Sequence, residues 1–258
     1  MKQNKVILIS IDGMRPDGLL ACKNPYVDEL RKIAYYTLNS RTVLPSSSLT
    51  CHMSLFHSVT AERHGIITND YMPMVRPMNG LFEQLYNAGK VNAFYYGWEP
   101  LRDIARPRTC KFAEHINAYT EESSDTSLTD SALARIKKSK PDFVFLYMVE
   151  TDEKGGHDNG WMSDEYLRRI SMAIDNVKRV IDECSDEYAI IITADHGGHD
   201  RTHGTDMDED MIIPHFYIGK DFEAGKQFDG GSILDITPTI AKIIGIEPAP
   251  EWEGKPVI

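Results

Sequence analysis

The sequence is poor in cysteine, in positive charge and in long apolar runs, and each shortage excludes a class of protein. Its four cysteines include no C-x-x-C pair, so we expect free thiols in a reducing compartment rather than a disulfide framework. No apolar run approaches the roughly 20 residues that span a bilayer. The net charge of −11 argues against nucleic-acid polymers and anionic membranes as partners.

The chain also shows no internal repeat, low-complexity tract or obvious linker. Its first residues are basic, but the apolar run that follows is short and reaches Asp12 without a small-residue cleavage site. Such a start is typical of a first strand rather than a signal peptide. With an ordinary apolar content of 41%, the sequence predicts a single soluble domain over residues 1–258, located in the cytoplasm.

Apolar runs and helical spacings alternate along the chain, which predicts an α/β fold. Strands are expected at 5–11, 91–96, 142–149, 189–192 and 212–218, with a short extended piece at 36–42. Helices are expected at 26–33, 81–87, 130–138, 163–184 and 233–244, with a loop-rich excursion at 102–127. This alternation predicts a mostly parallel central sheet with helices on both faces.

Acidic and histidine residues follow three of the expected strands. They are Asp12, then Asp152 and His157 in one glycine-rich loop, and then Asp195, His196 and His203 in a second. Because parallel strands end at the same edge of a sheet, the three carboxylates would repel one another unless cations lay between them. Histidine nitrogens favour Zn²⁺, with Mn²⁺ and Fe²⁺ as alternatives. The sequence therefore predicts a metal cluster rather than unrelated polar surface loops.

Three consecutive serines, Ser46 to Ser48, precede a helical spacing of Leu49, Met53 and Phe56. Capping of the helix by these side chains is the plainer interpretation. The alternative is a nucleophilic hydroxyl at the positive end of the helix dipole, where an alkoxide and a phosphate are both stabilised. The serines alone leave both interpretations open.

The order of these segments resembles the alkaline phosphatase superfamily, and within it the type I phosphodiesterase/nucleotide pyrophosphatase family. The motifs are I-S-I-D-G at Ile9, P-S-S-S-L-T-C-H-M-S at Pro45, E-R-H-G-I-I-T-N at Glu62, D-E-K-G-G-H at Asp152, T-A-D-H-G at Thr193 and T-H-G at Thr202. They extend from the first strand to His203. The resemblance implies an alkaline-phosphatase-like fold with minimal or no cap domain. It also implies a hydrolase of phosphodiester or nucleotide pyrophosphate bonds in small molecules.

The resemblance further implies two divalent metal ions, most simply Zn²⁺. Asp12, Asp195 and His196 would hold one ion together with the Ser48 hydroxyl, and Asp152, His157 and His203 would hold the other. Ser48 stands where the family usually has threonine and would form a phosphoseryl intermediate. Asn69 would contact a phosphoryl oxygen.

The chain departs from the family at two further places. Asp152 and His157 are five residues apart where the family often shows four, which predicts a one-residue adjustment of the loop. Leu49 stands where nucleotide-cleaving members often carry an aromatic residue that stacks on the base. His52 and His64 are expected to be structural.

His199 and Asp200 are expected to orient the metal ligands rather than to bind metal themselves. Arg15 is a candidate for the cationic side chain that monoesterases usually place against the extra phosphate charge. A phosphomonoesterase and a phosphonate or sulfate ester hydrolase of the same superfamily are therefore alternatives, although Ser48-Leu49-Thr50 lacks the C/S-x-P-x-R pattern of sulfatases. A metal-binding module without catalysis is the non-enzymatic alternative, and the oligomeric state stays open.

Overall fold

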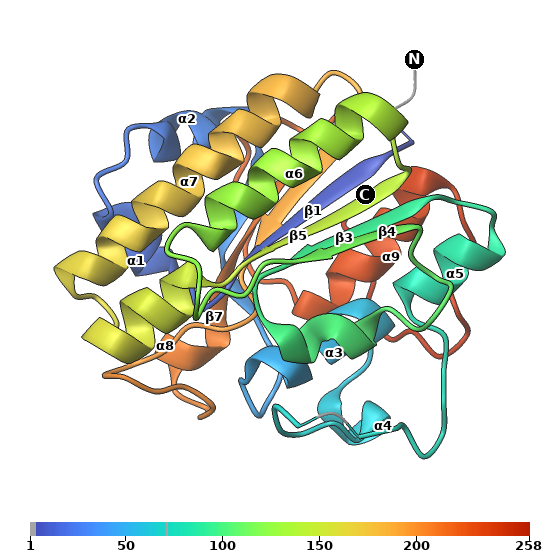
Figure 1. The fold of residues 1–258 in the computed structure, drawn as a ribbon, viewed down its shortest axis with the longest axis horizontal. Coiled ribbons are helices and arrows are strands. Elements are labelled where there is room, and N and C mark those ends of the chain that lie inside the picture. The colour runs from blue at the N-terminus through green and yellow to red at the C-terminus, as the bar shows by residue number, and fades with distance from the viewer. Residues whose placement is uncertain (1–3, 71) are drawn as a thin grey trace.

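The computed structural model describes residues 4–70 and 72–258, which fold around one seven-stranded sheet (Figure 1). The strand order is β2 (Tyr35–Arg41), β7 (Ile212–Ile218), β6 (Ala189–Thr193), β1 (Val6–Ile11), β5 (Phe143–Met148), β3 (Asn92–Tyr96) and β4 (Phe112–His115). Among the strands of the described residues, β7 runs in the opposite direction to the other six, which confirms the mostly parallel sheet. Residues 1–3 and Tyr71, which the expected single domain includes, lie outside the described residues.

The three central strands are apolar along their whole length because both faces of the sheet are covered there. Every residue of β6, β1 and β5 is buried. Their register pairs Ile11 with Met148 on one side of β1 and Ser10 with Thr193 on the other. The carboxyl ends of these strands therefore lie side by side, and the chain leaves the sheet there.

Two groups of helices cover the sheet, which confirms helices on both faces (Figure 1). One group consists of α1 (Pro16–Ala21), α2 (Tyr26–Ile33), α6 (Ser124–Ser139) and α7 (Asp164–Cys184), and the other of α3 (Ser48–His57), α5 (Leu81–Asn87) and α9 (Ile236–Ile244). The expected helix at 163–184 is α7, with Ser163 as its N-cap accepting a hydrogen bond from Tyr166 N. Within the described residues, no helix combines the length and apolar character that a membrane span needs.

The expected loop-rich excursion at 102–127 is wrong in part, because it contains more regular structure than its sequence indicates. It holds the second half of η1 (Glu99–Ile104), the edge strand β4 and the first turn of α6. β4 pairs only with β3 and is largely exposed, so it lacks the apolar run that marks a buried strand. The first turn of α6 is polar because Asp125 accepts hydrogen bonds from Val149 N and Glu150 N instead of facing water.

The expected glycine-rich loop after β5 is also wrong, because the segment is the π-helical turn η2 (Thr151–His157). Four short elements complete the chain, namely α4 (Ala61–His64), α8 (Asp208–Met211), η1 and η3 (Ile233–Asp235). The helix expected at 233–244 is η3 followed directly by α9. The helices α1 and α4 carried no clear periodic signal because each is shorter than two turns.

Candidate metal centre

Three neighbouring strands deliver three aspartates to one place at the carboxyl edge of the sheet. Asp12 follows β1 directly, Asp195 lies two residues after β6, and Asp152 lies four residues after β5 in η2. All three side chains are buried. In the part of the chain that the structure describes, each keeps one carboxylate oxygen without a hydrogen-bond partner. Buried anionic oxygens without partners are costly unless a cation compensates them, so the three residues fit divalent metal ions.

The first group of possible metal ligands consists of Asp12, Asp195 and His196, whose ligand atoms all lie within 4.8 Å of one another. His196 Nε2 lies 3.3 Å from Asp12 Oδ1 and 3.5 Å from Asp195 Oδ2. The other ring nitrogen, Nδ1, lies 2.8 Å from the Gly197 carbonyl oxygen. Donation to that carbonyl leaves the lone pair of Nε2 facing the carboxylates, which is the arrangement a metal-binding histidine needs.

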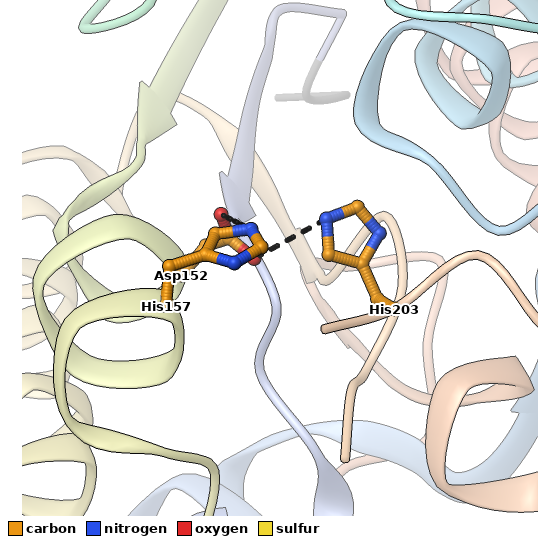
Figure 2. Close-up of side chains that lie close together, drawn as sticks. All are labelled: Asp152, His157 and His203. Carbon is orange, nitrogen blue, oxygen red and sulfur yellow. Dashed lines mark ion pairs between the residues drawn. The ribbon is translucent and has the colours of Figure 1, made fainter. Parts of the chain in front are cut away.

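The second group consists of Asp152, His157 and His203, with the same 4.8 Å limit between ligand atoms. Figure 2 shows both imidazole rings directed at the Asp152 carboxylate, with Nε2 of His157 at 3.4 Å and Nε2 of His203 at 3.9 Å. Nδ1 of His157 lies 3.0 Å from Arg201 O, and Nδ1 of His203 lies 2.8 Å from Ser46 O. Backbone carbonyls therefore fix both rings with Nε2 pointing inward.

The π-helical turn η2 explains how Asp152 and His157 face the same point although five residues separate them. Its N–H groups bond to carbonyls five residues back, as Asp158 N does to Glu153 O, which makes each turn wider than an α-helical one. Gly156 permits this path because a Cβ there would lie 2.6 Å from the ring of Trp161. The expected one-residue adjustment thus occurs within a helical turn and not in a loop.

Burial and mutual repulsion dominate the electrostatics of the site. Burial, with the nearby Asp152 and Asp195 carboxylates, raises the pKa of Asp12 well above its usual range, and burial with Asp195 does the same to the pKa of Asp152. Burial opposes ionisation of Asp195 too, but the neighbouring His196 holds the pKa of Asp195 below its usual value. Burial and His196 lower the pKa of His203 to about 3, so this imidazole is neutral, as a metal ligand must be.

The three serines at the start of α3 have three different partners, and only Ser48 faces the candidate metal ligands. Ser46 Oγ donates to Thr205 O, and Ser47 Oγ donates to Thr50 Oγ1. The capping interpretation is wrong for Ser47, because this N-cap residue makes no side-chain hydrogen bond to the backbone of α3. Ser48, the first residue of the helix, has Oγ 3.0 Å from His196 Nε2 and is buried. Its hydroxyl therefore adjoins the first ligand group.

Asn69 lies in the exposed segment after α4 and reaches back to the start of α3. Its Oδ1 accepts a hydrogen bond from Leu49 N at 3.1 Å. The side-chain amide nitrogen is then available to donate into the pocket that Asn69 and Ser48 share. Leu49 itself is fully buried, so its side chain cannot stack on a ligand.

One pocket contains members of both ligand groups. It is lined by Asp12, Ser48, Asn69, Trp98, Tyr119, Val149, Asp152, Glu153, His157 and His203. Neither lysine nor arginine occurs among these described lining residues. Arg15 is wrong as the candidate phosphate-binding cation, because it pairs with Asp17 at 2.6 Å, donates to Gly198 O and lines a different pocket.

Sequence patterns did not indicate the side chains that hold the Asp12–Gly13 turn. The Tyr147 hydroxyl, from within β5, donates to Asp12 Oδ2. Trp161 Nε1 and Tyr166 OH both donate to the Gly13 carbonyl, at 3.0 and 2.9 Å. A signal was present for Tyr147, because its hydroxyl is the only polar side-chain group in the strand Phe143–Met148.

Two other histidines of the motifs are buried beside the site but lie outside both ligand groups. His52 Nδ1 lies 2.8 Å from Ser48 O, and its Nε2 lies 3.1 Å from Ser10 Oγ. His64 Nε2 lies 2.9 Å from Ser54 Oγ. Both rings therefore link neighbouring segments around α3.

His199 also lies outside the two groups, and a contact with the buried Asp210 fixes the loop that contains it. Its Nδ1 lies 2.7 Å from Oδ1 of the buried Asp210, whose other oxygen accepts from both N and Oγ1 of Thr205. Asp200 has a left-handed backbone with φ of 46°, and its carbonyl accepts from Trp161 N. These contacts fix both ends of the loop that carries His203.

Comparison with known proteins shows which family the chain resembles. The family model for type I phosphodiesterase/nucleotide pyrophosphatase matches residues 6–213. Mouse ectonucleotide pyrophosphatase/phosphodiesterase family member 1 is 26% identical over 225 residues, covering 74% of the chain. The chain spans about a quarter of the length of that relative, because the match covers 24% of it.

Solved structures share the fold at lower sequence identity. Human ectonucleotide pyrophosphatase/phosphodiesterase 5 superposes with a TM-score of 0.83 at 14% identity, covering 97% of each chain. A phosphonate monoester hydrolase from Silicibacter pomeroyi superposes with a TM-score of 0.77 at 17% identity, covering 99% of this chain and 76% of its own. The alkaline-phosphatase-like fold is therefore confirmed.

Proposed function

Because the chain belongs to the type I phosphodiesterase/nucleotide pyrophosphatase family, we propose that it hydrolyses phosphodiester or nucleotide pyrophosphate bonds with Ser48 as the nucleophile. One observation supports this proposal above all others. The Ser48 hydroxyl and the Asn69 amide share a pocket with Asp12 and Asp152, and each of these aspartates has a buried carboxylate oxygen without a partner among the described residues. Metal-assisted phosphoryl transfer requires a nucleophile, a hydrogen-bond donor and a set of ligands that binds cations.

We propose two divalent cations, with Zn²⁺ favoured by the mixture of carboxylate and imidazole donors. Asp12, Asp195 and His196 would hold one, with Ser48 beside them, and Asp152, His157 and His203 would hold the other. When bound, such ions supply Lewis-acid chemistry, lowering the pKa of the hydroxyl and polarising the phosphoryl oxygens.

Ser48 lies at the amino end of α3, where the helix dipole stabilises both an alkoxide and a phosphate. Its Oγ attacks phosphorus in line with the departing ester oxygen, forming a phosphoseryl intermediate. Asn69 is held through Oδ1 by Leu49 N, so its amide N–H donates to a phosphoryl oxygen as charge develops. Water then hydrolyses the phosphoserine and restores the Ser48 hydroxyl.

The charge of the pocket favours phosphodiesters over monoesters. A monoester dianion carries one more negative charge than a diester, and the described lining residues offer no lysine or arginine to receive it. The cation nearest in sequence to Asp12, Arg15, is paired with Asp17 outside the pocket.

Initial rates on matched chromogenic esters test the function. The protein is stripped with a chelator, reloaded with Zn²⁺, Mn²⁺ or Mg²⁺, and assayed with bis(p-nitrophenyl) phosphate, thymidine monophosphate p-nitrophenyl ester and p-nitrophenyl phosphate. We expect no turnover after stripping, and a kcat/KM for the diesters at least about tenfold above that for the monoester. A protein that binds metal but cleaves none of the three would be a metal-binding module, and a monoester preference would make it a phosphomonoesterase.

A further inference from the structure

Ser46 lies two residues before Ser48 and makes two hydrogen bonds to the loop after β6. Its Oγ donates to Thr205 O at 2.8 Å, and its carbonyl oxygen accepts from His203 Nδ1 at 2.8 Å. The side chain of Ser46 is fully buried. The segment before the proposed nucleophile and the loop that carries a candidate metal ligand are therefore joined at one residue, through both its side chain and its main chain.

Thr205 is itself fixed from the other side of its loop. Its backbone N and its Oγ1 each donate to Asp210 Oδ2 at 2.8 Å. Asp210 is fully buried, and its own carbonyl oxygen accepts from Gly197 N at 2.8 Å. The Thr205 carbonyl group therefore meets the Ser46 hydroxyl from a fixed position, and the hydrogen bond between them has a rigid acceptor.

The chain around Ser46 leads directly into α3. Ser47 N donates to Pro45 O at 2.9 Å, and the helix begins at Ser48. Ser48 Oγ in turn lies 3.0 Å from His196 Nε2. A displacement of Ser46 therefore moves the Ser48 hydroxyl relative to the first ligand group.

Ser47 has the same side chain but a different partner. Its Oγ donates to Thr50 Oγ1 at 3.0 Å, which is a contact within the first turn of α3 and not with the loop after β6. Removing the Ser47 hydroxyl leaves both bonds of Ser46 in place. Ser47 is therefore the matched control for any test of Ser46.

We propose that Ser46 is a positioning residue that couples the second ligand group to the nucleophile, an inference that rests on the function proposed above. Through its carbonyl group Ser46 orients His203, so that Nε2 of the ring points at the site of the second ion. Through its hydroxyl it holds the start of α3 against the same loop, so that Ser48 is fixed for attack. Loss of the Ser46 hydroxyl therefore loosens both the ligand and the nucleophile.

Metal affinity tests the contact with the second ligand group without any turnover. Ser46→Ala and Ser47→Ala are each combined with His196→Gln, which leaves the second group intact, and with His157→Gln, which leaves the first group intact. Competition with a chromogenic chelator measures the dissociation constant of Zn²⁺.

We expect Ser46→Ala to weaken Zn²⁺ binding by about 10- to 100-fold in the His196→Gln background, and by less than about threefold in the His157→Gln background. Ser47→Ala should change neither affinity. An unchanged affinity of the Ser46→Ala variant in the His196→Gln background, or an equal loss in both backgrounds, would overturn the coupling.

Steady-state kinetics of the Zn²⁺-loaded single variants test the effect on the nucleophile. At saturating Zn²⁺, Ser46→Ala is expected to lower kcat for bis(p-nitrophenyl) phosphate by about tenfold or more and to leave KM within about threefold, because the ester still binds while Ser48 is poorly oriented. Ser46→Thr keeps a hydroxyl and should restore kcat to within about threefold of wild type, whereas Ser47→Ala should match wild type. A wild-type kcat in the Ser46→Ala variant, or a threonine variant no better than alanine, would show that the hydroxyl does not position Ser48.

The two sets of measurements separate this inference from the proposed function. If the wild type cleaves no ester while Ser46→Ala selectively weakens binding at the second ligand group, Ser46 positions His203 and the hydrolytic function fails. If the wild type cleaves the diesters while Ser46→Ala changes neither metal affinity nor kcat, the hydrolytic function stands and the coupling is wrong.

Discussion

Ser48 Oγ and His196 Nε2 lie 3.0 Å apart, so the amino end of α3 meets the loop after β6 at a single hydroxyl group. His196 also lies 3.3 Å from Asp12 across the end of β1. This contact places the proposed nucleophile directly against the first ligand group. Each of the four predictions that follow changes one part of this arrangement or its support.

The first prediction concerns the nucleophile. Ser48→Ala is expected to lower kcat by at least roughly a thousandfold while leaving the metal content unchanged, because the hydroxyl is lost and the six Asp and His ligands remain. Ser48→Thr keeps a hydroxyl at the same position and should retain activity within about tenfold. Steady-state rates and elemental analysis measure both quantities. Full activity in the alanine variant would refute the assignment of Ser48.

The second prediction concerns the division of the ligands into two groups. His196→Gln and His157→Gln each remove one nitrogen ligand from a different group, so each should reduce the bound metal from about two ions per chain to about one. The exposed His115 lies outside both groups, and His115→Gln should leave the metal content unchanged. Elemental analysis after dialysis decides the matter, and two ions in both ligand variants would contradict the division.

The third prediction concerns Tyr147, which donates to Asp12 Oδ2 from within the sheet. Tyr147→Phe leaves that oxygen without its donor and frees the carboxylate to rotate, so metal affinity should fall by about 10- to 100-fold. The matched control is Tyr188→Phe, which removes another buried hydroxyl that donates to Pro141 O. Competition with a chromogenic chelator measures the affinities. Equal affinities in the two variants would show that Tyr147 does not position Asp12.

The fourth prediction concerns the pH dependence of stability. Burial and the Glu150 carboxylate raise the pKa of Asp125 to about 7, whereas an aspartate in the unfolded chain titrates near 4. Between these values the folded protein holds a proton that the unfolded chain has released. The free energy of unfolding therefore falls as pH rises, by up to about 1.4 kcal/mol per pH unit.

Asp125→Asn cannot titrate and should lack this contribution. Urea unfolding of metal-free wild type and variant from pH 5 to 8 measures it as the change in the difference between their free energies of unfolding. Comparing the two proteins cancels the titration of the metal ligands, which both contain. Parallel pH dependences would show that the Asp125 carboxyl does not carry the proton.

The candidate metal ligands were predictable because each one lies shortly after a recognisable strand or in the glycine-rich segment that follows it. The apolar runs of β1, β5 and β6 mark where the chain leaves the sheet, and the parallel arrangement brings those exits together. Helix periodicity made α7 predictable as well, because its apolar face is regular over its whole length. A strand on the edge of the sheet, such as β4, lacks that signal because water covers much of it.

Directions of side chains were not predictable in the same way. Gly13 has a left-handed backbone with φ of 65°, so Arg15 beyond it meets Asp17 and not the pocket. Ser46, Ser47 and Ser48 are chemically identical, and only the register of α3 decides which hydroxyl faces His196. Such choices depend on single backbone angles that the sequence pattern does not carry.

The wide turn of η2 also affects how relatives of this chain can be recognised from sequence patterns. A search pattern with a fixed four-residue interval between aspartate and histidine would pass over this protein, since Asp152 and His157 are five residues apart. The π-helical turn accommodates this five-residue spacing, and the candidate ligand atoms lie within 4.8 Å of one another. A π-helical turn thus lets residues five apart present the pair of side chains that an α-helical turn would present from residues four apart.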